Sequence, residues 1–171
     1  LNYSSILKFI CDSEKISNQK LGPISFAFSV GGNFLFNSPM YYFRLFSHAA
    51  GHINLVHFFS NFMIILLIGP ILEEKYGSKK IFLMILTTAL ITGIIQTLLF
   101  NSILMGASGI AFMMIVLISM SNFKSGEIPL TFLLVSFLYL GKELTESFAF
   151  QNDSISHFAH IIGGICGGLY G

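Results

Sequence analysis

Gly106-Ala107-Ser108-Gly109 leads directly into the apolar run Ile110-Ala-Phe-Met-Met-Ile-Val-Leu-Ile118. A single hydroxyl stands between two glycines at the start of this run. A serine in an aliphatic helix can be inert, because its hydroxyl can bond back to a carbonyl one turn earlier. The glycines, however, remove side-chain bulk on both sides and let another backbone approach closely. The role of Ser108 therefore depends on whether other parts of the chain supply groups that could activate it.

The composition is that of a protein surrounded by lipid. Of the 171 residues, 54% are hydrophobic and only 10% are charged, and nineteen are Phe. The mean hydropathy is +0.77, whereas about a quarter of the residues of a soluble domain are charged. The net charge of +1 indicates no nucleic-acid partner. Cys11 and Cys166 lie at opposite ends without the spacing of a metal site.

The apolar segments predict an all-α class, a polytopic membrane helical bundle with five recognisable spans. We expect these spans over Asn54–Leu72, over Lys80 to about Phe100, from Gly106 to Met120, over Pro129–Leu140, and from about Ser156 onward. Residues 1–53 are expected to form an N-terminal segment and an interfacial loop, with Tyr41-Tyr42-Phe43-Arg44 at the headgroups. Residues 54–171 are expected to form the helical spans, so that 1–171 is a single membrane domain.

Lysines in the short loops give an orientation. Lys75, Lys79 and Lys80 follow the first span and Lys124 follows the third, while the loops on the other side carry almost no cations. Positive residues are retained on the cytoplasmic side. The first, third and fifth spans should therefore all begin at the outer face.

Four polar residues then fall at one depth. Ser108, His160, and the i,i+4 pair His57 and Asn61 all lie near the outer ends of their spans. Such groups are costly in hydrocarbon, so a shared hydrated cavity is predicted. A serine and a histidine are the minimum for nucleophilic catalysis. His57, Asn61 and the Ser108 N–H could stabilise an oxyanion.

Glycines after His160 predict close packing of the fifth span. Gly163 and Gly167 are spaced four apart, as are Gly164 and Gly168, and this spacing is typical of tight helix contacts in membranes. Contact between the third and fifth spans would bring His160 within hydrogen-bond reach of Ser108. His157 could compete with His160 as the base, but the glycine pattern favours His160.

The remaining histidines allow a metal as an alternative. His48 and His52 are spaced i,i+4 and could bind zinc with His57. No carboxylate or thiolate lies nearby to complete such a site. We therefore expect neither a metal nor a cofactor, and we expect His48 and His52 to donate hydrogen bonds to loop carbonyls.

The complete set of motifs resembles the rhomboid intramembrane serine proteases. It comprises His48-Ala-Ala-Gly-His52, His57, Asn61, Gly106-Ala-Ser108-Gly109 and Ala159-His160-Ile-Ile-Gly163, in this order. The resemblance implies a Ser-His dyad without aspartate that cuts a substrate's transmembrane segment near the outer face. Ser108 then matches the nucleophile and His160 the base, while His57 and Asn61 match the oxyanion donors. Structural support is expected from Gly106, Gly109, Phe112, Gly163, Arg44 and Glu73.

Two departures from the family pattern stand out. The family core has six spans, and nothing before Asp12 is long enough for the first, so that span is expected to be missing or truncated. The aromatic residue one turn after the serine is often tyrosine and here is Phe112, which keeps ring stacking on His160 and loses a hydroxyl.

The resemblance also implies the setting of the protein. We expect a multi-pass protein of the bacterial inner membrane whose active site opens to the outer face. Its partners would be transmembrane protein substrates and the lipid bilayer. A catalytically inactive relative that binds transmembrane helices is the alternative. A transporter is a third possibility, but the chain contains neither an inverted repeat nor paired helix breaks.

Overall fold

The computed structural model describes residues 26–31, 38–100, 102–123, 137 and 154–171. The elements within them are α3 (Pro39–Ser47), the 3-10 turn η1 (His48–Ala50), α4 (Leu55–Tyr76), α5 (Ser78–Leu99), α6 (Ser108–Phe123) and α8 (Ser154–Tyr170). The only β pairing in these residues is an isolated antiparallel bridge between Val30 and Leu104. The all-α class predicted from the sequence is confirmed. The span expected over 129–140 lies outside the described residues, apart from Phe137.

Local signals set the ends of the two longest helices. The Asn54 side-chain oxygen accepts the backbone N–H of His57 at 2.8 Å and caps the start of α4. Gly77, with a φ of 83°, ends α4 and donates its N–H to the Glu73 carbonyl. Ser78 Oγ donates to Glu73 Oε1 at 2.5 Å. A single residue thus joins α4 to α5, and α5 begins two residues earlier than predicted.

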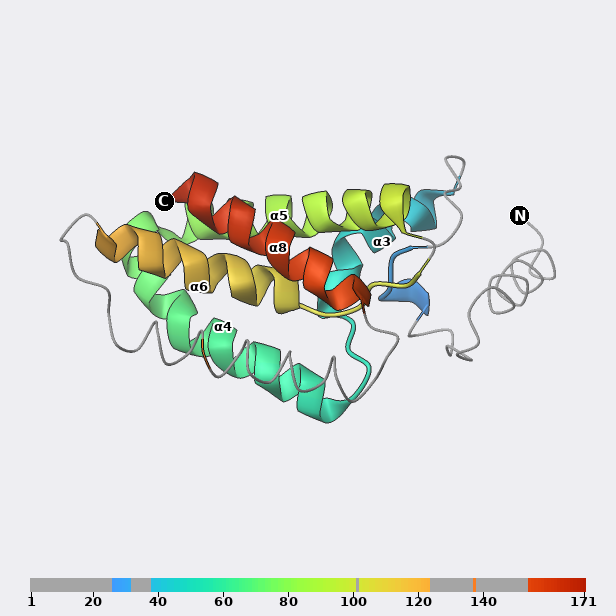
Figure 1. The fold of residues 1–171 in the computed structure, drawn as a ribbon, viewed down its shortest axis with the longest axis horizontal. Helices are drawn as coiled ribbons and strands as arrows, with labels where there is room; N and C mark the ends of the chain where they lie inside the picture. The colour runs from blue at the N-terminus through green and yellow to red at the C-terminus, as the bar shows by residue number, and fades with distance from the viewer. Residues whose placement is uncertain (1–25, 32–37, 101, 124–136, 138–153) are drawn as a thin grey trace.

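Helix α6 is the centre of the bundle. It contacts α8, α4 and α5, and Figure 1 shows it between α4 and α8. Its side chains are buried on several faces, with Met113, Met114, Ile115 and Leu117 at most 2% exposed. A helix that is apolar all round belongs in an interior, and the main core cluster forms around these residues.

Helices α4 and α5 present apolar surface outward. Each has 22 residues and is long and apolar enough to cross a membrane, since about 20 residues span the hydrocarbon. α6 and α8 are shorter apolar helices. Large side chains are exposed along both long helices, among them Met63 and Leu67 on α4 and Phe82 and Leu98 on α5. Such faces suit lipid rather than water.

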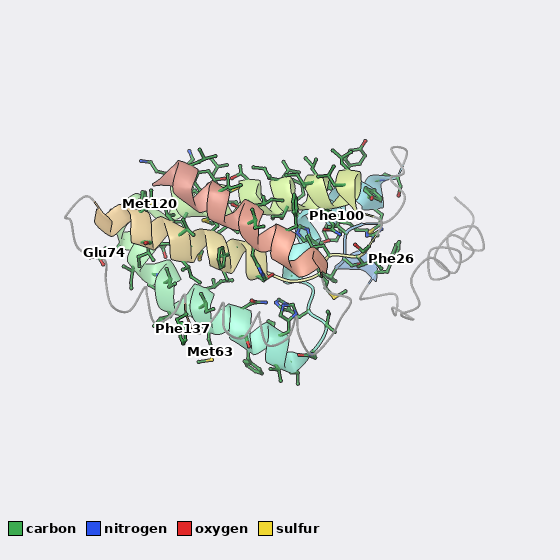
Figure 2. All side chains as sticks on the ribbon, in the orientation of Figure 1. Phe26, Met63, Glu74, Phe100, Met120 and Phe137 are labelled. Carbon is green, nitrogen blue, oxygen red and sulfur yellow. The ribbon has the colours of Figure 1, made fainter. Side chains whose placement is uncertain are left out.

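Three helices begin at the same end of the bundle. Figure 1 shows α4, α6 and α8 starting together at the right, while α5 runs in the opposite direction. Figure 2 labels Phe26 and Phe100 at this end and Glu74 and Met120 at the other. The prediction that these three spans run in the same direction is therefore met in the fold (Figure 1).

Non-helical segments cover this end of the bundle. Val30 and Leu104 exchange backbone hydrogen bonds of 2.9 and 2.7 Å, which pairs residues 26–31 with the connection between α5 and α6. Gln96, near the end of α5, donates to the Ser102 carbonyl at 2.9 Å. The Gly106 N–H donates to the His48 carbonyl at 2.9 Å. The segment that leads into α6 is therefore fixed from several directions.

Candidate active site

Ser108 is the first residue of α6. It is 7% exposed, and the turn before it contains Gly106 with a φ of 133°. This φ favours glycine, since other residues rarely adopt it. The first N–H groups of a helix have no partner within the helix and carry its positive dipole end. A hydroxyl and several backbone donors are thus brought to one point.

His57 lies against the turn that precedes Ser108. A Cβ added at Gly106 would be 2.7 Å from the His57 Cε1 and 3.1 Å from its Nε2. Glycine is thus required at position 106 both for its φ and for the space that the imidazole occupies. Asn61 follows His57 by one turn of α4 and is 2% exposed.

The backbones of α6 and α8 touch next to Ser108 and His160. A Cβ at Gly163 would overlap the Gly109 carbonyl oxygen, and a Cβ at Gly109 would be 3.2 Å from the Ala159 carbonyl oxygen. Ser108 directly precedes Gly109, and His160 lies between Ala159 and Gly163. The two side chains therefore come from adjoining turns, and His160 is 5% exposed.

The other glycines of α8 differ in their contacts. A Cβ at Gly167 would overlap the Met113 carbonyl oxygen, and one at Gly164 would be 3.3 Å from the Phe112 ring. Gly168 has nothing within 4 Å of an added Cβ, so the prediction of close packing is wrong at that position. Gly163 and Gly167 lie against the backbone of α6 and Gly164 lies against its side chains, whereas Gly168 is outside this contact face.

Phe112 stacks on His160, as the sequence predicts. The ring centroids are 5.6 Å apart and the planes are inclined by 30°. Phe112 follows Ser108 by one turn of α6, so the stack places the imidazole beside the start of that helix. The His157 side chain, the other candidate base, lies outside what the structure describes.

The two histidines between α3 and α4, His48 and His52, contact backbone carbonyls. His48 is 2% exposed, and burial lowers its pKa to about 4, against the smaller opposing effect of hydrogen bonds to the backbone carbonyls of Arg44 and Leu45. Its neutral ring can donate from Nδ1 to the Arg44 carbonyl at 3.3 Å. His52 Nδ1 lies 3.2 Å from the Ala50 carbonyl. Both contacts fit the predicted role as loop donors.

Arg44 is buried within the protein. It is 4% exposed, so its side chain contacts protein groups. Its Nε donates to the Ser29 carbonyl at 2.5 Å, and its guanidinium lies 4.0 Å from the Phe26 ring centroid. Burial lowers the pKa of Arg44, and nearby Tyr41 opposes this. The cation is stabilised by a carbonyl dipole and aromatic faces, and it fastens residues 26–29 to α3.

Glu73 is exposed at the opposite end of the bundle from Ser108. It accepts the Ser78 hydroxyl and its carbonyl accepts the Gly77 N–H. It therefore stabilises the turn between α4 and α5 and has no direct contact with the candidate site in the described residues.

Sequence reasoning missed a polar stripe on α5. Thr88, Thr92 and Gln96 are at most 4% exposed. Thr92 Oγ1 lies 3.4 Å from His48 Nε2, and its methyl carbon would be 3.4 Å from a Cβ at Gly109. The i,i+4,i+8 spacing of these residues in an apolar helix is a signal that could have identified an inward-facing polar edge.

The assembled residues have the elements of acyl-transfer chemistry. A buried hydroxyl and a buried imidazole occupy adjoining turns. The His57 imidazole lies against the turn before the hydroxyl, and the Asn61 amide follows it by one turn of α4. Within the described residues no three His, Cys, Asp or Glu side chains gather as metal ligands do.

Comparison with known proteins agrees with this reading of the fold and sequence. A family model for the Rhomboid domain matches residues 39–171. No curated protein matches the chain at a significant level. The match covers most of the chain, from α3 to the end of α8, and α4 and α5 are long enough to cross a membrane and expose apolar side chains. The protein is therefore an integral membrane protein that belongs to the rhomboid family.

Proposed function

We propose that this chain is an intramembrane serine endopeptidase that cleaves transmembrane segments of membrane-protein substrates. The observation that carries the proposal is the backbone contact between α6 and α8 at Gly109 and Gly163. This contact supports a Ser108–His160 dyad because the two residues flank it. The stack of Phe112 on His160 supports the same pairing.

In the proposed reaction, Ser108 Oγ attacks the scissile carbonyl carbon while His160 takes the hydroxyl proton. The carbonyl oxygen becomes an oxyanion, which accepts hydrogen bonds from His57, Asn61 and the first N–H groups of α6. The C–N bond then breaks as His160 gives its proton to the leaving amine. Water, deprotonated by His160, hydrolyses the acyl-enzyme and releases Ser108.

The proposed setting is the inner membrane of a bacterial cell, with the active site opening to the outer face. Lys75 in the last turn of α4 and Lys79 and Lys80 in the first turn of α5 support a cytoplasmic position for that end of the bundle. The starts of α4, α6 and α8 lie at the other end (Figure 1). The proposal treats residues 1–171 as one membrane domain with transmembrane substrates and lipid as partners.

The test is cleavage of a transmembrane substrate by the full chain in lipid vesicles. Ser108→Ala and His160→Ala should each abolish cleavage while the protein still inserts, and a fluorophosphonate probe should label the wild type but not Ser108→Ala. Ser119→Ala is the matched control, since Ser119 is a buried serine of the same helix, three turns away. It should cleave at the wild-type rate.

The outcomes separate the two candidate functions. Undiminished cleavage by Ser108→Ala or His160→Ala would rule out the dyad. A wild type that neither cleaves nor reacts with the probe, yet captures transmembrane helices, would identify an inactive relative instead.

A further inference from the structure

His52 lies in the connection between η1 and α4, and its ring contacts the ring of His57. The two centroids are 5.2 Å apart with the planes inclined by 68°, an edge-to-face pair. Phe58 packs on His52 in the same manner, at 5.1 Å and 89°. The hydrogen bond to the Ala50 carbonyl adds a third point of attachment. The His52 ring is thus fixed in place by its own loop and by α4.

The second ring nitrogen of His52, Nε2, is buried and forms no hydrogen bond within the residues that the structure describes. Beyond its own loop, the ring therefore acts through contacts with other rings. Burial also lowers the pKa of His52, against a smaller opposing effect of the hydrogen bond to the Ala50 carbonyl.

His57 is in turn held between two segments that are distant in sequence. Gly106, from the connection between α5 and α6, lies against its imidazole, and His52 packs on the same ring. An oxyanion donor acts only when it lies about 2.7–3.1 Å from the developing charge. Rotation of this imidazole would break such a hydrogen bond, so the orientation of the ring matters as much as its presence.

We propose that His52 is a positioning residue for His57. Its ring, anchored to Ala50 and packed edge to face on His57, fixes the orientation of the imidazole that donates to the oxyanion. This role rests on the proposed protease function. In this role His52 affects the stability of the transition state through His57, in addition to holding its own loop through the Ala50 carbonyl.

Two substitutions separate the ring from the hydrogen bond. His52→Gln keeps a donor for the Ala50 carbonyl and lacks the ring, whereas His52→Phe keeps a ring and lacks the donor. With the full chain in lipid vesicles, His52→Gln should lower kcat about two- to tenfold with KM unchanged, the range expected for loss of an aromatic pair. His52→Phe should stay close to the wild type.

The decisive readout is coupling to His57. In a His57→Ala background, His52→Gln should cause no further loss of kcat, because the group that it positions is gone. An equal loss in both backgrounds, or a His52→Phe variant as slow as His52→Gln, would overturn the proposal and leave the protease function intact.

A measurement independent of activity separates the proposal from the function. By NMR on the full chain in micelles, the His57 ring signals should move in His52→Gln, because the ring current of the neighbour is lost. If the wild type cleaves no substrate but the His57 signals shift in His52→Gln, the protease function is refuted and the contact between the two rings is supported. Unchanged His57 signals would refute the positioning role in either case.

Discussion

Replacing Gly163 with alanine would put a methyl group into the backbone contact between α6 and α8. The new Cβ would overlap the Gly109 carbonyl oxygen and lie 2.9 Å from the carbonyl carbon and 3.1 Å from the Cα. These are backbone atoms, so no side-chain rotation relieves the overlap and the helices must separate. Restoring a C···O contact of about 3.3 Å requires a shift on the order of 1 Å. Such overpacking costs about 1–3 kcal/mol of stability.

The same shift moves His160 away from Ser108. A displacement of about 1 Å between reacting groups lowers the rate roughly a hundredfold, so Gly163→Ala should reduce kcat by about that factor. Gly168→Ala is the matched control, since it adds the same methyl to the same helix where nothing lies within 4 Å. Both substitutions gain about 1 kcal/mol of helix propensity, so the difference between them isolates the contact.

Initial rates of cleavage in lipid vesicles would give kcat for both variants, and thermal unfolding would give their stability. We expect Gly168→Ala to match the wild type in kcat and to be at least as stable. A folded Gly163→Ala variant with a kcat within about threefold of Gly168→Ala would refute the reasoning, because the contact would then not set the separation of the dyad.

Phe112→Leu should lower kcat about two- to tenfold by removing the ring that stacks on His160, whereas Phe112→Tyr should retain the wild-type kcat. Equal losses in the two variants, in the same cleavage assay, would contradict a role for stacking. Stability should fall as the pH drops from 6.5 toward 4, because the unfolded chain then binds a proton at His48 that the folded chain excludes. The loss should reach up to about 3 kcal/mol near pH 4; denaturation in detergent at several pH values would measure it, and a His48→Gln variant with the same pH dependence would contradict this origin.

Periodic and capping signals predicted much of the fold. The span after Asn54 begins where its side chain caps the helix, and the third span begins at the glycine-flanked Ser108. These features are local, since they depend on residues within one or two turns. The common direction of α4, α6 and α8 (Figure 1) also followed from the alternation of apolar spans along the sequence.

Long-range contacts account for what the sequence did not reveal. An arginine beside three aromatic rings is typical of a membrane interface, but Arg44 is buried because its partners are the Ser29 carbonyl and the Phe26 ring. Neither partner is recognisable from the residues around Arg44. The contact of Thr92 with His48 and the Gly109 backbone likewise depends on how α5 lies against α6.

Glycine spacing identified the contact face of α8 only in part. Gly163 and Gly167 lie against α6, while Gly168 does not. A helix with glycines on two faces carries no local signal that distinguishes them, since the choice depends on which neighbour is present.

The order in which the helices are made has a consequence for the life of the nascent protein. α6 supplies the hydroxyl and α8 supplies the imidazole, and α8 follows α6 in the chain. A chain still on the ribosome, inserted only as far as α6, has a serine without its proton acceptor. In the proposed enzyme, proteolytic competence therefore begins only after α8 has been synthesised and has docked, so the translocation machinery and neighbouring nascent helices are not exposed to an active site during insertion.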